Sequence, residues 1–109
     1  MRTFKFNEPN YEMLGKGKIS TVRKGVKSDL SIGSRLRLEN EQSGEAVSVT
    51  VRKIEFTMVM DLTSSHAVND GFSCVSDLVE ELEECYGGSF NSVEIVTVIT
   101  FNHIGKAPL

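Results

Sequence analysis

Alternation of apolar and polar residues predicts the short strands of this chain. In a β-strand successive side chains point to opposite faces, so a half-buried strand reads as apolar-polar-apolar. Of three strand-like segments, the first and third, residues 3–6 and 36–38, follow this pattern, and the second, residues 19–23, is a strand-like run after a glycine turn. Residues 40–45 contain Ser43-Gly44 and separate the third segment from a longer one, which predicts a hairpin turn.

The longest alternating stretch changes its phase once. Val47, Val49 and Val51 share one parity, and the apolar positions then resume on the other parity at Ile54, Phe56 and Met58. A slip of one residue predicts a β-bulge near residues 52–53, and bulges bend the strand that carries them. A later run, residues 93–101, is apolar at both parities and predicts a strand buried on both faces.

Capping residues and helical spacing predict three helical segments. Glu8-Pro9 opens a turn that reaches about Leu14, and Asp61 or Thr63 caps a short helix that ends near Asn69, before Gly71. Ser73 is the expected cap of a longer helix over residues 74–86. One face of that helix is apolar, with Val75, Leu78, Val79, Leu82 and Tyr86. Its acidic residues, Glu80, Glu81, Glu83 and Glu84, are expected on the solvated side.

The order of these segments favours an α+β fold. Five strands, few helices and a bent central strand predict a small mixed β-barrel with helices at its ends. The chain shows no internal repeat and no linker, so we expect one domain over residues 1–109.

Composition places the chain among ordinary cytoplasmic proteins. Of its 109 residues, 39% are hydrophobic and 25% are charged, and no apolar run approaches the length of a membrane span. The first residues lack the apolar centre of a signal peptide, so we expect a cytoplasmic location. Cys74 and Cys85 lie on one predicted helix at about 16 Å, too far apart for a disulfide. No short Cys or His spacing suggests a zinc site.

The net charge of −3 conceals two halves of opposite sign. Residues 1–53 carry a charge of +5 and residues 54–109 carry −8. The basic half is suited to a nucleotide or an RNA strand, or else the two halves pack together and neutralise each other. Both interpretations remain open at this stage.

The segment Gly17-Lys18-Ile19-Ser20-Thr21-Val22-Arg23 is the strongest candidate for chemistry. A lysine that precedes the strand can lean toward Thr21, and a lysine beside a hydroxyl is a recurring base–nucleophile pair. The alternative is a polar edge strand after a glycine turn. A phosphate-binding loop is excluded, because Ile19 follows the lysine where the motif requires Ser or Thr.

Other polar residues are weaker candidates. His66 and His103 are expected to have structural roles. Asp70 lies at a predicted helix end, where a carboxylate is disfavoured by the helix dipole, although Asn69-Asp70-Gly71 also reads as an ordinary turn.

The order of several motifs resembles the ASCH domain family of the PUA-like superfamily. The resemblance starts with Gly17-Lys18-x-x-Thr21-Val22-Arg23 and Ile32-Gly33-x-x-Leu36-x-Leu38. It continues through residues 62–71, the helix that ends in Tyr86 and the final Val-Ile-Thr-Phe strand, covering residues 11–101. It implies a PUA-like β-barrel of about five to six strands with two to three short helices, and a cleft beside the strand that follows the lysine.

Within that family the chain most resembles small bacterial amidohydrolases that deacetylate 4-acetylcytidine. The resemblance implies Lys18 as proton acceptor, Thr21 as nucleophile and Asp70 as proton donor. It also implies that Arg23 binds the substrate, and we expect Ser20 to contribute. The chain departs from the family pattern in three places, with Asp70 for the common Glu, Ile19 for the Thr after the lysine, and Ser34 for the Asp after the glycine.

This hypothesis describes a monomer that needs no metal or other cofactor. Its expected partner is a modified nucleoside or RNA, and no membrane is involved. Two rival functions use the same cleft: an RNA- or nucleotide-binding ASCH module without turnover, and a ribonuclease.

Overall fold

The computed structural model describes residues 2–106, without the side chains of residues 103, 104 and 106. Its strands and helices follow the predicted order. They are β1 (Arg2–Phe6), α1 (Glu8–Glu12), β2 (Ser20–Lys24), β3 (Arg35–Asn40), β4 (Ala46–Met58), the 3-10 turn η1 (Val59–Asp61), α2 (Ser64–Asn69), α3 (Val75–Tyr86) and β5 (Ile95–Lys106).

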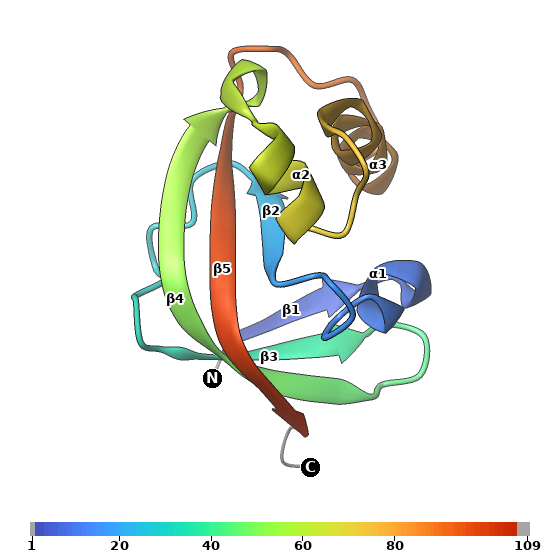
Figure 1. Cartoon of the computed structure of the whole chain (residues 1–109), viewed down its shortest axis with the longest axis vertical. Helices are drawn as coiled ribbons and strands as arrows, with labels where there is room; N and C mark the ends of the chain where they lie inside the picture. Colours follow the sequence, from blue (N-terminus) through green and yellow to red (C-terminus); the bar gives the residue numbers. More distant parts are fainter. Residues whose placement is uncertain (1, 107–109) are drawn as a thin grey trace.

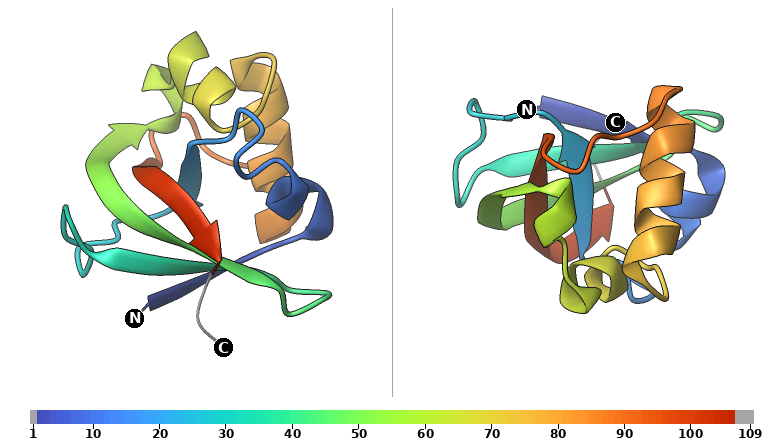
Figure 2. Two further views of the ribbon diagram at one scale, coloured as in Figure 1. Left: turned by 60° about the horizontal axis from the view of Figure 1, so that its bottom comes forward. Right: turned by 90° about the horizontal axis from the view of Figure 1, so that it is seen from above.

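The five strands form one sheet in the order β1-β3-β4-β5-β2. All neighbouring pairs are antiparallel except β1 and β3, which run parallel. The sheet curls into a half-barrel, with α2 and α3 over one end and α1 at the end of β1 (Figure 1). Figure 2 shows from two further directions that the curl turns β1 and β2 toward the same interior. The predicted α+β class is thus confirmed, and the described residues form the predicted small barrel as an open half-barrel of five strands.

Bulges in β4 produce the bend. The register of β4 against β5 shifts between Ser48 and Thr50 and again between Val51 and Lys53. The second shift confirms the bulge that the change of hydrophobic phase predicts, and the first is additional. Each bulge increases the local twist, so β4 bends between its start, where it pairs with β3, and the rest of its length, where it pairs with β5.

The core has two parts that share β5. One lies in the lower part of the half-barrel and contains Phe4, Phe6, Leu36, Leu38, Val49, Val51, Ile99 and Phe101. The other lies under the helices and contains Val22, Val59, Leu62, Ala67, Leu78, Leu82, Val96 and Val98. Residues 96–99 are all buried, which confirms the prediction of a strand enclosed on both faces.

The helix caps agree with the predictions in one case and differ in another. Thr63, one of the two expected caps, begins α2, where its Oγ1 accepts a hydrogen bond from the backbone N–H of His66. The expectation that Ser73 caps the longer helix is wrong. Cys74 occupies that position in extended conformation and makes no side-chain cap hydrogen bond, so α3 begins one residue later than expected.

Candidate functional site

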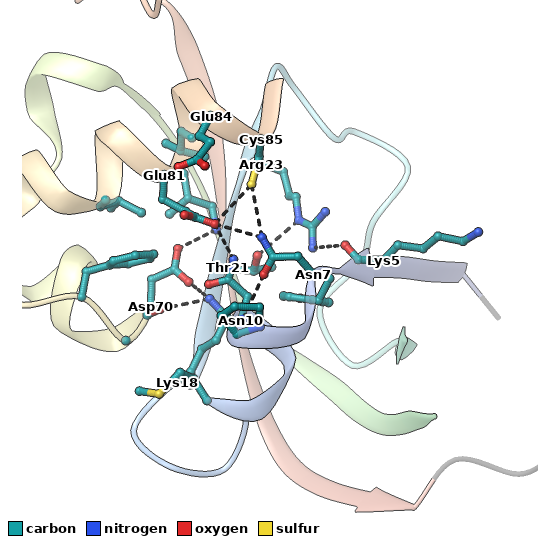
Figure 3. Close-up of a pocket in the computed structure, with 18 of the residues that line it drawn as sticks. Lys5, Asn7, Asn10, Lys18, Thr21, Arg23, Asp70, Glu81, Glu84 and Cys85 are labelled. Atoms are coloured by element: carbon teal, nitrogen blue, oxygen red, sulfur yellow. Dashed lines mark hydrogen bonds and ion pairs between the residues drawn. The ribbon is translucent and has the colours of Figure 1, made fainter. Parts of the chain in front are cut away.

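A pocket of about 610 Å³ lies between the two edge strands of the sheet. β1 and β2 are not paired with each other, so the curl of the sheet leaves an opening between them. α1 and α3 form the other walls, and Figure 3 shows the side chains of Thr21 on β2, Asn10 on α1 and Glu81 on α3 directed toward one another. Ligand pockets in proteins commonly have volumes between about 300 and 1,000 Å³.

Lys18 is the buried cation of this pocket. It precedes β2 and is 2% exposed, and its side chain lies against the rings of Phe6 and Phe72, at 5.7 and 5.8 Å from their centroids. Burial, and secondly the guanidinium of Arg23, lower the pKa of Lys18 from 10.5 to about 7. Such a group exchanges its proton near neutral pH, as a catalytic base must.

Asp70 is the direct partner of Lys18. Its carboxylate forms an ion pair with Lys18 through Oδ1, its backbone carbonyl accepts a second hydrogen bond from Nζ at 3.0 Å, and Oδ2 accepts one from the backbone N–H of Val22 at 3.2 Å. The residue caps the C-terminal end of α2, and Gly71 follows with a φ of +90°. This conformation turns the chain sharply enough to direct the carboxylate into the pocket (Figure 3).

Thr21 and Arg23 occupy the face of β2 that lines the pocket. The Thr21 Oγ1 accepts a hydrogen bond from Arg23 Nε at 3.2 Å. The guanidinium carbon lies 4.9 and 4.5 Å from the ring centroids of Phe4 and Phe6, and Nη2 donates to the carbonyl of Lys5, so Arg23 connects the two edges of the sheet. Burial lowers the pKa of Arg23, but a guanidinium remains charged at neutral pH.

The pairing differs from the one expected from the sequence. Lys18 contacts Asp70 and Thr21 contacts Arg23, and none of the described hydrogen bonds joins Lys18 to Thr21. Both residues nevertheless line the same pocket, because Lys18 lies before the strand, in the position from which it can lean inward.

Ser20 does not line the pocket. It alternates with Thr21 along β2, so its side chain points to the opposite face, where it is 1% exposed. Within the described part of the chain its Oγ has no hydrogen-bond partner. This position does not support the expected role of Ser20 in substrate binding.

A second polar group faces the pair from α1 and α3. The Oε2 atom of Glu81 accepts hydrogen bonds from Asn7 Nδ2 at 3.2 Å, Asn10 Nδ2 at 2.7 Å and Cys85 Sγ at 3.3 Å. Burial acts to raise the pKa of Glu81, but these hydrogen bonds and the charge of Lys18 outweigh it and lower the pKa. Burial, followed by the hydrogen bond to Glu81, raises the pKa of Cys85 to about 11, so this thiol stays protonated at neutral pH.

The sequence prediction missed this group. Glu81 was expected among the solvated acids of the helix, yet it lines the pocket together with Glu84. The sequence did contain a signal for this position. A helix turns by 100° per residue, so Glu81 lies only about 60° from Leu78 around the helix axis, next to the apolar face. Tyr86, expected on that face, is instead 42% exposed at the pocket rim, where its hydroxyl accepts a hydrogen bond from the backbone N–H of Lys24.

His66 has a structural role outside the pocket. Its Nδ1 accepts a hydrogen bond from the backbone N–H of Thr63 at 2.9 Å, which places the ring hydrogen on Nε2, 3.0 Å from Glu55 Oε1. The side chain of His103 lies outside the described residues. Both cysteines in the described chain are free.

Two kinds of feature are absent from the described residues. No group of three or more His, Cys, Asp or Glu side chains in residues 2–106 is arranged to hold a metal ion. None of the helices there is both long and apolar enough to cross a membrane.

Comparison with solved structures identifies the fold. The chain superposes on the ASCH domain from Lactobacillus crispatus JV V101 with a TM-score of 0.73 and 10% identity, covering 93% of this chain and 77% of that one. The chain has the ASCH fold. Protein EF3133 from Enterococcus faecalis V583, assigned to the family model DUF984, gives a TM-score of 0.67 at 14% identity, covering 92% and 69% of the two chains. Neither protein-family models nor curated proteins match the sequence. The structural match thus confirms the ASCH fold that the ordered motifs led us to expect.

Proposed function

We propose that the pocket is the active site of an amidohydrolase that removes the acetyl group from 4-acetylcytidine or a related acylated nucleoside. The observation that carries this proposal is the buried contact between Lys18 and Asp70 in a pocket that also contains the Thr21 hydroxyl. Amide hydrolysis requires a nucleophile, a base and an acid in one cavity.

The buried pair supplies the base and the acid together. With a pKa of about 7, Lys18 gives up its proton near neutral pH, and Asp70 is the acceptor in contact with it. Transfer of that proton leaves a free amine on Lys18 and a protonated carboxyl on Asp70. Burial makes this transfer less costly than it is in water, because a low-dielectric site penalises both charges of the ion pair.

In the first half of the reaction Lys18 takes the hydroxyl proton of Thr21 while Oγ1 attacks the acetyl carbonyl. The carbon–nitrogen bond then breaks, and Asp70 donates its proton to the departing amine. Arg23 Nε, 3.2 Å from Oγ1, stabilises the negative charge that develops on this oxygen. The products of this half are cytidine and acetyl-Thr21.

The second half hydrolyses the ester by the same proton transfers. Lys18 returns its proton to Asp70 and then takes one from a water molecule, whose oxygen attacks the acetyl carbon. Asp70 protonates the Thr21 oxygen as acetic acid leaves, and the acid then gives its proton to solvent to become acetate. Every proton taken by Lys18 is thus matched by one given by Asp70.

The charge of the pocket favours an uncharged substrate. Three basic residues, Lys5, Lys18 and Arg23, line it against four acidic ones, Glu41, Asp70, Glu81 and Glu84. This balance does not attract phosphate, whereas the rings of Phe6 and Phe72 offer apolar surface for a base. A free nucleoside is therefore preferred to RNA or a nucleotide.

The test is acetate release from 4-acetylcytidine by the purified protein. Lys18→Ala and Thr21→Ala are expected to lower kcat at least about 100-fold, the effect typical of general-base groups and nucleophiles. Lys16→Ala removes an exposed lysine near the site and serves as the control with unchanged kcat. Because the reaction needs one proton on the Lys18–Asp70 pair for Asp70 to donate, kcat/KM should fall as the pH rises through about 7, where Lys18 loses its proton to solvent.

Two results would contradict the proposal. Turnover that survives both substitutions would remove Lys18 and Thr21 from the chemistry. Absence of turnover in a folded wild-type protein, together with RNA binding that weakens with salt, would favour the rival binding module.

A further inference from the structure

The Glu81 carboxylate has no part in the proposed chemistry, although it lies in the same pocket as the reacting groups. Its three described hydrogen bonds, from Asn7, Asn10 and Cys85, all end on Oε2. Each comes from the protein itself, so they fix the position of the carboxylate and leave its other oxygen, Oε1, for a ligand. Figure 3 shows the carboxylate on the α3 wall, facing Asn7 and Asn10.

The orientation of this group is set in advance. Asn7 caps α1, and its Oδ1 accepts a hydrogen bond from the backbone N–H of Asn10 at 3.0 Å. The amide nitrogen of Asn7 must therefore face Glu81, and it can only donate. Because Asn10 also donates its amide nitrogen, two side chains from α1 hold a carboxylate of α3 that is more than 70 residues away in the chain.

An ionised carboxylate only accepts hydrogen bonds, so its ligand must present donors. A cytidine acylated on N4 has few donors. N3 and O2 of the base are acceptors, and the N4 hydrogen belongs to the amide that must lie at Lys18, Thr21 and Asp70. The remaining donors are the hydroxyl groups of the ribose.

We propose that Glu81 binds the ribose, with Oε1 accepting hydrogen bonds from the vicinal 2′- and 3′-hydroxyls of the nucleoside. This inference rests on the proposed function for the placement of the acylated base. It makes Glu81 a determinant of sugar specificity, supported by Asn7 and Asn10 as positioning residues.

The test compares 4-acetylcytidine with 4-acetyl-2′-deoxycytidine. The wild type should prefer the ribonucleoside about 10- to 100-fold in kcat/KM, as expected for a hydrogen bond to a charged group. In Glu81→Gln the amide oxygen stays with Asn7 and Asn10, so an N–H₂ donor replaces the acceptor, and the preference should fall below about threefold. Glu80→Gln makes the same change on α3 outside this pocket and should keep the wild-type preference.

Asn10→Ala is a second variant. It keeps the charge of Glu81 but removes one of the hydrogen bonds that hold its carboxylate in position. It should reduce the preference by less than Glu81→Gln does. A wild-type protein that does not discriminate, or a Glu81→Gln protein that discriminates as the wild type does, overturns the inference.

Binding of cytidine and 2′-deoxycytidine, followed by NMR titration, separates this inference from the proposed function. A preference for cytidine that Glu81→Gln abolishes, in a protein that releases no acetate, supports the ribose site and contradicts the amidohydrolase. Acetate release without any sugar preference supports the amidohydrolase and overturns the ribose site. A protein that binds neither nucleoside overturns it as well.

Discussion

Removing one member of the buried Lys18–Asp70 pair should destabilise the fold more than removing both. The two side chains are 3% and 4% exposed, so water hydrates a charge left without its partner only poorly. Lys18→Met leaves the Asp70 carboxylate with the Val22 N–H at 3.2 Å as its one described side-chain hydrogen bond. Loss of a single partner from a buried pair costs about 3–5 kcal/mol.

The other two variants should be less costly. Asp70→Asn keeps an oxygen for the Val22 N–H, and Lys18 can respond by losing its proton, since its pKa is already about 7. We expect a cost of about 1–3 kcal/mol at pH 7.5, as for an unsatisfied buried polar group. In Lys18→Met with Asp70→Asn no buried charge remains, so the double variant should lose about 2 kcal/mol or less.

Urea unfolding at pH 7.5 measures these free energies, provided that the dependence on urea is the same in all variants. The exposed pair Arg2–Asp29, with side chains 40% and 56% exposed, is the matched control. In Arg2→Met, Asp29→Asn and their combination the coupling should stay below about 1 kcal/mol. If the effects of Lys18→Met and Asp70→Asn add within about 0.5 kcal/mol, the pair is not coupled and the reasoning is refuted.

Three further predictions follow from the same geometry. Because the pKa of Lys18 falls from 10.5 to about 7 on folding, the unfolded chain binds more protons between these pH values. The unfolding free energy of the wild type should therefore rise from pH 7 to pH 9, by at most about 3 kcal/mol in urea titrations, and Lys18→Met should lack this rise. Folding raises the pKa of Cys85 from 9.0 to about 11, so the folded protein holds less of its reactive thiolate. At pH 7.5 Cys85 should therefore react with iodoacetamide about 100-fold more slowly in the folded than in the urea-unfolded protein. Equal rates would contradict the partly desolvated, hydrogen-bonded environment of this thiol. Gly71→Ala and Gly33→Ala, at φ values of +90° and +91°, should each cost about 1–2 kcal/mol in urea unfolding. Only Gly71→Ala should also lower acetate release, because relief of the backbone strain at this position would shift the adjacent Asp70. Equal losses of acetate release in both variants would refute the local explanation.

The strands were predictable because their signals are local. The change of phase between Val51 and Ile54 predicts the bulge, and the doubly apolar run predicts the enclosed strand β5. The alternation of side chains along a strand depends only on neighbouring residues. It can therefore be read directly from the sequence. The parallel pairing of β1 with β3 has no comparable local signal, because it joins segments more than 30 residues apart.

The site was predictable only in part, for the same physical reason. Lys18, Thr21, Arg23 and Asp70 were candidates, and all four line one pocket. Their partners were not predictable, since Lys18 meets Asp70 across 52 residues of chain. Glu81 was missed because its partners, Asn7 and Asn10, come from the other end of the sequence.

The incomplete closure of the sheet explains why a buried charged pair can exist in so small a protein. A closed barrel would pair β1 with β2 and fill the space between them with apolar side chains, as small barrels do. Here the two edges stay unpaired, and Arg23 joins them through the carbonyl of Lys5 and the rings of Phe4 and Phe6. The opening leaves a pocket beside Lys18, and the rings of Phe6 and Phe72 keep its ammonium poorly hydrated. Poor hydration is the environment that lowers the pKa of a lysine. Bulges that bend β4 are therefore as necessary to the candidate chemistry as the residues that line the pocket, because a straighter β4 would separate the two edges between which the pair is enclosed.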